Sequence, residues 1–444
     1  MATLSALPYK GTRDYYPEDK RVQNYIFNTW RTTVERYGYQ EYGAPILEPL
    51  EVYAAKSGQE LANEQTYSFV DRGDRVVAIR PEMTPSISRM VAARRQELTY
   101  PARLYSIANF MRYERPQRGR EREFWQLNAD VFGVDNAAAD AEIIGLAYEI
   151  MKAFGAKDEM FTIRVNDRKL IDFMMSSYLG LDAIGTQLMV KLFDRRNKIT
   201  EDEFTQQARE IFGEYADQGI AKINELLKVK NVGELPTELL QSTAAQDVRK
   251  LTMMLDKMGV KNLRFDVTLM RGLDYYTGTV FEVFDLHPDN NRSMFGGGRY
   301  DGLVGLFGAE PIPTVGMAPG LSTTELFLRT HNLLPELAPA TEIGIVVVDE
   351  DSLDGALALA KRFRDEGVNV EVDISGRKFD KQIKSVLKKQ LPFIVFVGET
   401  ELKDDRYNFK DTVTAEEETL SPERIVSRVK DQRRPKSAGD ELFV

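Results

Sequence analysis

The 444-residue chain contains no cysteine and only two histidines, His287 and His331. The absence of cysteine excludes disulfides, thiolate nucleophiles and cysteine-ligated zinc. With so little histidine, a zinc site and a Ser-His-Asp triad are both unfavoured. Any chemistry must therefore use arginine, carboxylates, tyrosine, glutamine and the backbone.

The chain also lacks long apolar runs. No window approaches the 18 consecutive apolar residues of a membrane span. The N-terminus has no basic segment followed by an apolar run, as a secretory signal would have. We therefore expect a cytoplasmic protein with no membrane partner. The net charge of −10 argues against a nonspecific coat on nucleic acid, although local basic patches decide specific recognition.

The pattern of apolar residues predicts several elements in the first part of the chain. Residues 22–37 have the spacing of an amphipathic helix closed by Gly38. The runs RLYSIANFMRYE and EFWQLNADVFG predict a long antiparallel hairpin with RPQRGR at its tip. Residues 167–258 are mostly helical and predict an inserted helical subdomain. The segment 263–283 predicts two strands joined by the turn RGLDYYTG.

The last part of the chain has a different pattern. Two prolines mark residues 331–341 as a linker. After it, strands and helices alternate regularly, which predicts a compact α/β domain of residues 342–430 with a largely parallel sheet. Residues 431–444 are polar and predict a mobile tail.

Arginine is concentrated at the tip of the predicted hairpin. Guanidinium groups match phosphate oxygens bidentately, so the tip could bind phosphates. The alternative is a solvated tip, with Glu114, Glu121 and Glu123 as ion-pair partners. Phe124 and Trp125 beyond the tip either stack on a base or fill the core. The five arginines are Arg112, Arg115, Arg118, Arg120 and Arg122.

Polar residues at strand positions are further candidates. Glu82, in RPEMT after a predicted strand, could hold an ammonium group, or the segment could be a surface turn. Gln126 and Asp130 are an even number of positions apart and share one strand face, which is a pocket only if something covers it. The glycines of FGGGRYDGL could let the backbone approach a ligand or form a glycine-rich turn.

A lysine stripe marks one helix of the last domain. Positions 381, 384 and 388 share a face of that helix. The stripe could follow an RNA backbone or could simply be a solvated face.

Taken together, these segments resemble histidyl-tRNA synthetases over nearly the whole chain. MRYERPQRGREREFWQLNADVFG is similar to class II motif 2, and YGYQEYGAPILEPLEVY is similar to motif 1, the dimer element. RGLDYYTGTVFE and GGGRYDGL are similar to the two histidine-specific signatures. The last domain resembles the anticodon-binding domain of the prolyl, threonyl and glycyl enzymes. The resemblance implies an α/β (α+β) fold, with a class II antiparallel-sheet catalytic domain over residues 1–330 and an anticodon-binding domain over 342–430.

The resemblance implies a two-step reaction in a homodimer. Histidine and ATP form histidyl-adenylate, and the histidyl group then passes to tRNA(His). Arg112 and Arg271 would be catalytic, neutralising charge on the α-phosphate from opposite sides. ATP, with Mg²⁺ assisting and no resident metal, would be bound by Arg112, Glu114, Arg120 and Phe124. The tRNA-binding residues would be Arg115, Arg118, Lys381, Lys384 and Lys388.

By the same resemblance, one set of residues would bind the amino acid. Glu82, Thr84 and Gln126 would receive its α-amino group. The imidazole would be read by buried hydrogen-bonding groups, which reject isosteric substrates. The full set is Glu82, Met83, Thr84, Gln126, Asp130, Arg271, Tyr275, Tyr276 and Tyr300.

The chain departs from the family pattern at two places. Asp130 stands where many members have glutamate, and a shorter carboxylate needs a closer ligand or a bridging water. In TVGMAPGLSTTELFL, which aligns with motif 3, Ser322, Thr323 and Thr324 stand where an acid, an arginine and a leucine are usual. The nucleotide contact of that arginine is either missing or made by another residue, such as Arg120 or Arg118.

Two alternative functions are open. A non-catalytic histidine-binding paralogue, acting as regulatory subunit of ATP phosphoribosyltransferase, is favoured by the missing motif 3 arginine. Against it stand Arg112, Arg271 and the full C-terminal domain. A class II synthetase for another amino acid is disfavoured by RGLDYY together with Asp130 and Tyr276.

Overall fold

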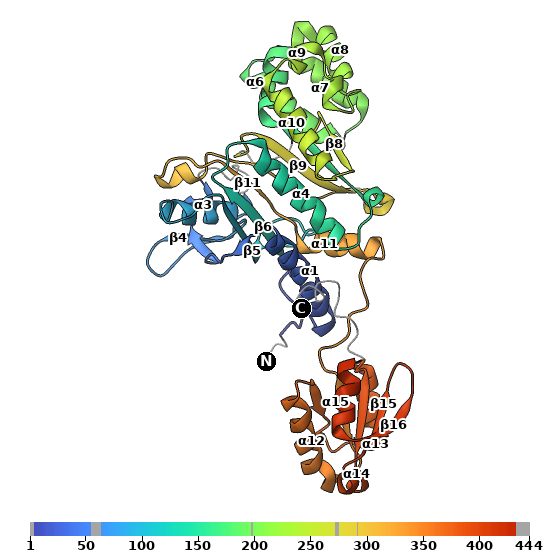
Figure 1. The fold of residues 1–444 in the computed structure, drawn as a ribbon. Helices are drawn as coiled ribbons and strands as arrows, with labels where there is room; N and C mark the ends of the chain where they lie inside the picture. Colours follow the sequence, from blue (N-terminus) through green and yellow to red (C-terminus); the bar gives the residue numbers. More distant parts are fainter. Residues whose placement is uncertain (1–3, 55–63, 197–198, 271–274, 291, 432–444) are drawn as a thin grey trace. The chain divides into compact units, whose positions relative to one another are not determined.

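The computed structural model describes residues 4–54, 64–196, 199–270, 275–290 and 292–431 (Figure 1). They belong to two compact units, Met1–Asp14 with Ile26–Leu334, and Tyr15–Tyr25 with Pro335–Val444. The predictions for Arg271 and for the tail beyond residue 431 lie outside the described residues. No helix in the described ranges is long and apolar enough to cross a membrane.

The first unit contains an eight-stranded sheet in the order β1-β5-β6-β11-β10-β9-β7-β8. Neighbouring strands from β5 to β7 pair antiparallel, whereas β1 and β8 pair parallel at the two edges. The long hairpin of β5 and β6 is confirmed, because Ala102 pairs with Phe132 and Met111 with Glu123. The strands are β1 Gln40–Glu41, β5 Ala102–Met111, β6 Glu123–Phe132, β7 Phe161–Asp167, β8 Leu263–Phe265, β9 Thr279–Asp285, β10 Ser293–Arg299 and β11 Thr314–Met317.

Helices cover this sheet through apolar stripes. The helix α4, Ala137–Ala153, buries Ile143, Leu146 and Ile150 and contacts β6, β9 and β11 (Figure 1). The predicted amphipathic helix is α1, Pro17–Arg36, which buries Trp30 completely. Two further helices, α3 (Thr84–Ala93) and α11 (Leu321–Thr330), start at polar segments that the sequence singled out.

A small antiparallel sheet of order β2-β4-β3 stands apart from the large one. It is formed by β2 Leu47–Pro49, β4 Val76–Ile79 and β3 Ser68–Val70, beside the short helix α2, Glu51–Ala54. Several of its large apolar side chains are exposed to solvent, namely Leu47, Phe69, Val70 and Val76. A concentration of exposed apolar side chains is typical of an interaction surface.

Helices occupy the stretch between β7 and β8. Phe193, Phe204 and Leu226 are among the residues of a separate apolar core within this stretch, which lies beyond β8 in Figure 1. The helices are α5 Arg168–Phe173, α6 Ala183–Arg195, α7 Glu201–Phe212, α8 Ala216–Leu226, α9 Thr237–Leu240 and α10 Thr243–Lys257.

The predicted strand pair around RGLDYYTG is wrong. β8 and β9 do not pair with each other; each pairs with β7, on opposite sides. β8 ends at Phe265 because Asp266 forms a local turn, in which its Oδ1 accepts hydrogen bonds from the backbone and hydroxyl of Thr268. The apolar alternation that follows is therefore not a strand in the described residues.

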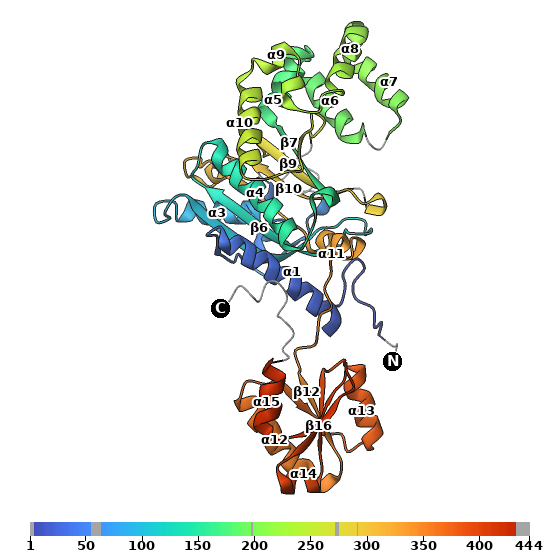
Figure 2. The same ribbon diagram turned by 45° about the vertical axis from the view of Figure 1, so that its right-hand side comes forward.

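The second unit is a five-stranded sheet of order β13-β12-β14-β15-β16. Helices α12 and α15 pack against one face, through Phe363 and Ile425, and α13 packs against the other through Val386 (Figure 2). The strands are β12 Ile343–Val347, β13 Val370–Val372, β14 Phe393–Val397, β15 Tyr407–Asp411 and β16 Glu417–Leu420. The helices are α12 Leu353–Asp365, α13 Phe379–Lys388, α14 Glu399–Asp404 and α15 Pro422–Asp431.

The expectation of a largely parallel sheet holds for only half of the pairings in this unit. β13, β12 and β14 are parallel, whereas β14, β15 and β16 pair antiparallel. The turn that reverses the chain between β15 and β16 is built by Asp411, whose Oδ1 accepts from the backbone of Val413 and Thr414. Ala415 completes it with a positive φ of 62°.

Candidate active site

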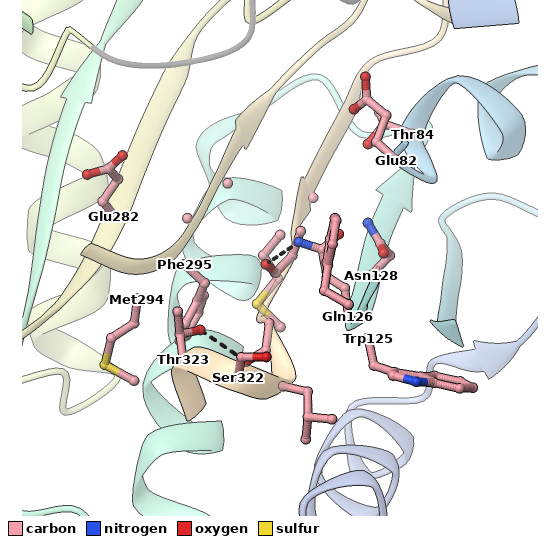
Figure 3. A pocket seen from close by; sticks show the side chains of 18 of the residues that line it. Glu82, Thr84, Trp125, Gln126, Asn128, Glu282, Met294, Phe295, Ser322 and Thr323 are labelled. Atoms are coloured by element: carbon pink, nitrogen blue, oxygen red, sulfur yellow. Dashed lines mark hydrogen bonds between the residues drawn. The ribbon is translucent and has the colours of Figure 1, made fainter. Parts of the chain in front are cut away.

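A polar pocket of about 400 Å³ opens on the large sheet of the first unit. Its walls come from β6, β9, β10 and β11, from the tip of the β5–β6 hairpin and from the start of α11. Figure 3 shows Gln126 and Asn128 of β6 together with Ser322 and Thr323 of α11 in this lining. The pocket collects residues that are more than two hundred positions apart in the sequence. Predicted site residues that line it are Glu82, Thr84, Arg112, Glu114, Arg120, Phe124, Gln126, Asp130, Tyr275, Tyr276 and Tyr300.

Glycines make room for the pocket. The FGGG segment is not a turn; it lies within β10. A Cβ on Gly298 would lie 2.9 Å from the Tyr276 ring, and one on Gly316 of β11 would lie 1.9 Å from Asp130 Oδ1. These distances are too short for any larger residue, so the glycines are needed for close approach.

Asp130 lies at the bottom of the pocket. It is 3% exposed, and its Oδ1 accepts a hydrogen bond from the Tyr300 hydroxyl. Its Oδ2 has no hydrogen-bond partner among the described residues. Burial raises the pKa of Asp130 to about 7, and the Tyr300 hydrogen bond opposes that rise. A buried carboxylate with a free oxygen is suited to receive an N–H donor from a ligand.

Three aromatic residues stand around this carboxylate. The rings of Tyr275 and Tyr276 are 5.1 Å apart, and those of Tyr275 and Tyr300 are 5.6 Å apart. The Tyr275 hydroxyl donates to Glu82 Oε2 at 3.2 Å. Burial raises the pKa of all three tyrosines, so each hydroxyl keeps its proton at neutral pH.

Gln126 and Asn128 lie on the same face of β6 as Asp130, at alternate positions. Gln126 donates from Nε2 to the carbonyl of Ala318 at 3.0 Å, which fixes the amide at the pocket wall (Figure 3). Asn128 is 4% exposed, lines the pocket, and has no partner for Oδ1 among the described residues. The sequence reasoning missed Asn128, although strand alternation alone places it between the two predicted residues.

The other end of the pocket is basic. The Arg112 guanidinium lies 5.2 Å from the centre of the Phe124 ring and donates from Nε to the Pro81 carbonyl at 2.9 Å. These two contacts hold it in place. Arg120, on the hairpin tip, faces Glu114 across 3.6 Å and is largely exposed. The pocket thus presents both carboxylates and guanidinium groups, which suits a ligand that carries both an amine and phosphates.

The start of α11 closes the basic end. Ser322 donates to Glu121 Oε2 at 2.8 Å, which ties the helix to the hairpin tip. The Thr323 hydroxyl donates to the Gly320 carbonyl at 3.1 Å (Figure 3). Both residues line the pocket, where the sequence departs from motif 3. Ser322 and Thr323 are uncharged, so any positive charge at this wall must come from other residues.

The remaining predicted residues lie elsewhere. Met83 is fully buried in a core cluster with Ala108 and Phe110 and is not part of the pocket lining. Arg115 and Arg118 are exposed on the hairpin tip. Lys381, Lys384 and Lys388 are exposed on α13 in the second unit.

Groups of three or more histidine, aspartate or glutamate side chains that could hold a metal do not occur in the described part of the chain. The pocket carboxylates Glu82, Glu114 and Asp130 are instead placed to meet a ligand. A metal at this site would need oxygen ligands from the substrate.

An antiparallel sheet carrying a polar pocket, with a separate α/β unit in the same chain, is the class II synthetase arrangement expected from the sequence. A family profile described as Histidyl-tRNA synthetase matches residues 11–323, and one described as Anticodon binding domain matches residues 342–432. A Histidine--tRNA ligase from Leptospira biflexa is 39% identical over 432 residues, covering 97% of this chain and 98% of its own. One from Haloarcula marismortui is 37% identical over 410 residues, covering 90% and 92%.

A solved structure agrees with the sequence comparison. The histidyl-tRNA synthetase from Nostoc sp. PCC 7120 superposes with a TM-score of 0.82 at 24% identity, covering 97% of this chain and 100% of its own. At that identity the likeness shows the fold. The chain belongs to the histidyl-tRNA synthetase family, and its expected fold class is confirmed.

Proposed function

We propose that this protein is a histidine–tRNA ligase that forms histidyl-adenylate from L-histidine and ATP and transfers the histidyl group to tRNA(His). The observation that carries the proposal is the pocket itself. It is lined by Asp130, whose Oδ2 has no partner among the described residues, and by Arg112, which is held against Phe124. The family uses ATP as a substrate, and the basic end of the pocket suits its phosphates.

In the first step, a carboxylate oxygen of histidine attacks the α-phosphorus of ATP. A new P–O bond forms, and the bond to pyrophosphate breaks. The reaction needs positioning and neutralisation of charge more than covalent help from the protein. Arg112 would stabilise the charge on the α-phosphate; Arg271, outside the described residues, would do so from the other side. Mg²⁺ would arrive with the phosphates of ATP, which supply its oxygen ligands.

Recognition of histidine would be shared between two groups of residues. Glu82, Thr84 and Gln126 would hold the α-amino group. Asp130 would accept a hydrogen bond from the imidazole, with Tyr275 and Tyr276 against the ring. Asn128 would join them, since it lines the pocket and its buried Oδ1 has no partner in the described part of the chain. Buried polar groups of this kind reject a substrate that leaves them unpaired.

ATP and tRNA would take the outer parts of the site. Phe124 would stack under adenine, with Glu114 at its edge and Arg120 on the outer phosphates. Arg115 and Arg118 would approach the acceptor end of the tRNA, because they are exposed on the hairpin tip. The lysine stripe of α13 would follow the RNA backbone.

The proposal also assigns a role to each domain of the chain. Residues 1–330 would be the catalytic domain, with helical insertion 167–258, and 331–341 the linker to the anticodon-binding domain at 342–430. The exposed apolar side chains of the small sheet, Phe69 and Val70 among them, support a homodimer. A cytoplasmic location follows only from the family.

The test is ATP–pyrophosphate exchange measured with each of the twenty amino acids. The expected result is exchange stimulated by histidine alone. Binding of histidine with no exchange would instead identify a non-catalytic relative. Exchange with a different amino acid would contradict the specificity assigned to Asp130.

A further inference from the structure

Three arginines lie close together beside the pocket, and one of them was not among the predicted site residues. Arg118 and Arg120 lie on the tip of the β5–β6 hairpin. Arg292 immediately precedes β10 and is more than 170 positions further along the chain. Its Nη1 donates to the carbonyl oxygen of Arg118 at 2.6 Å, and its Nε donates to Asn290 Oδ1 at 2.7 Å. We refer to Arg118, Arg120 and Arg292 as the guanidinium cluster.

Arg292 lies between the hairpin tip and α11. A Cβ placed on Gly119 would be 3.3 Å from Arg292 Nη1 and 3.7 Å from Leu326 of α11. Leu326 is one helical turn after Ser322, so the two share a face of α11. The guanidinium group therefore lies beside the helix face on which the motif 3 side chains would be carried.

The pairing of strands brings Arg292 to this place. β10 pairs antiparallel with β11, with Gly297 opposite Met317, and the Ala318 amide donates to the Gly296 carbonyl. Continuing this antiparallel course brings the start of β10 alongside the start of α11. A side chain just before β10 can therefore reach the same region as a side chain in the first turn of α11.

The charges in the guanidinium cluster are poorly balanced. Arg292 donates to an amide oxygen, on Asn290, and to a carbonyl oxygen, on Arg118, and both acceptors are neutral. Among the described residues, neither Arg292 nor Arg118 forms an ion pair, and Arg120 has only the 3.6 Å contact with Glu114. Burial and the neighbouring charges of Arg118 and Arg120 lower the pKa of Arg292, and the carboxylate of Asp285 only partly opposes this. Such a concentration of positive charge is stabilised by a polyanion, and guanidinium groups suit phosphate oxygens.

Within the cluster, Arg120 lines the pocket, together with Gly119, Ser322 and Thr323. Arg292 lies next to this wall, through its hydrogen bond to the Arg118 carbonyl. We propose that Arg292 binds the outer phosphates of ATP and thereby supplies the guanidinium group that the chain lacks at Thr323. The positive charge would then come from the residue before β10 and not from the first turn of α11. This inference rests on the proposed function, since it assigns a residue to the ATP site of that reaction.

The test compares ligands that differ only in their outer phosphates. Arg292→Gln removes the charge and retains an amide for the Arg118 carbonyl. We measure the binding of ATP, pyrophosphate and AMP to the full-length protein by isothermal titration calorimetry. A lost charged hydrogen bond corresponds to roughly 10- to 100-fold weaker binding of ATP and pyrophosphate, with AMP changed by less than about twofold.

Arg264→Gln is the matched control, because Arg264 is exposed on β8 and lies outside the pocket. It should leave all three dissociation constants unchanged. If Arg292→Gln does not fold, Arg292→Lys, which keeps a charge, is measured in the same way. It should weaken the binding of ATP but not the binding of AMP.

Two results would overturn the inference. ATP binding that is unchanged in Arg292→Gln would exclude a phosphate contact. Equal losses for ATP and AMP would mean that Arg292 only positions the hairpin tip through Arg118. These measurements need neither histidine nor tRNA, so they are separate from the exchange assay that tests the proposed function.

Discussion

Replacing Asp130 by asparagine should stabilise the empty protein while destroying its affinity for histidine. Asp130 is 3% exposed, and its Oδ2 has no partner among the described residues. Burial raises its pKa from 3.8 to about 7. The charged form is therefore unfavourable in the folded state until a ligand supplies a donor. Asparagine keeps an Oδ1 acceptor for Tyr300 and carries no charge.

The size and sign of the effect follow from proton linkage. Between pH 3.8 and about 7 the folded protein keeps a proton on Asp130 that the unfolded chain releases. Stability from this group is thus full at low pH and is lost as the pH rises through about 7. At 1.36 kcal/mol per pKa unit the loss above pH 7 is about 4 kcal/mol. About 2 kcal/mol of it falls between pH 5.5 and 8.

Urea unfolding followed by tryptophan fluorescence measures this directly. The chain has only two tryptophans, Trp30 and Trp125, and both lie in the first unit. Asp130→Asn should be the more stable protein at pH 8, and its advantage over the wild type should shrink by about 2 kcal/mol at pH 5.5. Added histidine should stabilise the wild type by about 2.7 kcal/mol at 100 times its Kd, and should not stabilise the variant.

Either of two outcomes would refute this reasoning. One is a variant less stable than the wild type at pH 8. The other is a difference in stability that does not change between pH 5.5 and pH 8. Both would mean that Asp130 is not held as a buried, uncompensated acid.

Three further predictions concern other parts of the protein. Gly316→Ala places a Cβ 1.9 Å from Asp130 Oδ1. The KM for histidine in the exchange assay should therefore rise at least about tenfold, and an unchanged KM would contradict the close approach of the two residues. Asn128→Leu removes a buried amide of similar size; the KM for histidine should rise roughly tenfold while that for ATP stays constant, and equal rises would mean general damage to the pocket. Neutralising the α13 stripe should raise the KM for tRNA in aminoacylation and reduce its salt dependence, with exchange unaffected; the changes are Lys381→Gln, Lys384→Gln and Lys388→Gln.

Local rules were enough to predict much of the fold. Alternation along β6 places Gln126 and Asp130 on one face, and the turn residues between β5 and β6 mark the hairpin. The regular alternation of strands and helices after residue 341 predicts the α/β unit. These signals depend only on neighbouring residues, so a single sequence is sufficient to read them.

Other features depend on contacts between distant segments. The turn at Asp266 ends β8 early, and the choice of β7 as the common neighbour of β8 and β9 is decided by the whole sheet. The approach of Gly316 to Asp130 joins two strands nearly two hundred residues apart. Arg292 had no motif around it, and only the pairing of β10 with β11 brings it beside α11.

The central claim is that this chain attaches histidine to tRNA at the expense of ATP. The most direct measurement is the transfer of labelled amino acid to unfractionated tRNA, with ATP present and each amino acid supplied in turn. The proposed function predicts acid-precipitable label with histidine alone, on a single tRNA that reads histidine codons. Histidine bound to the protein without any label on tRNA would contradict it.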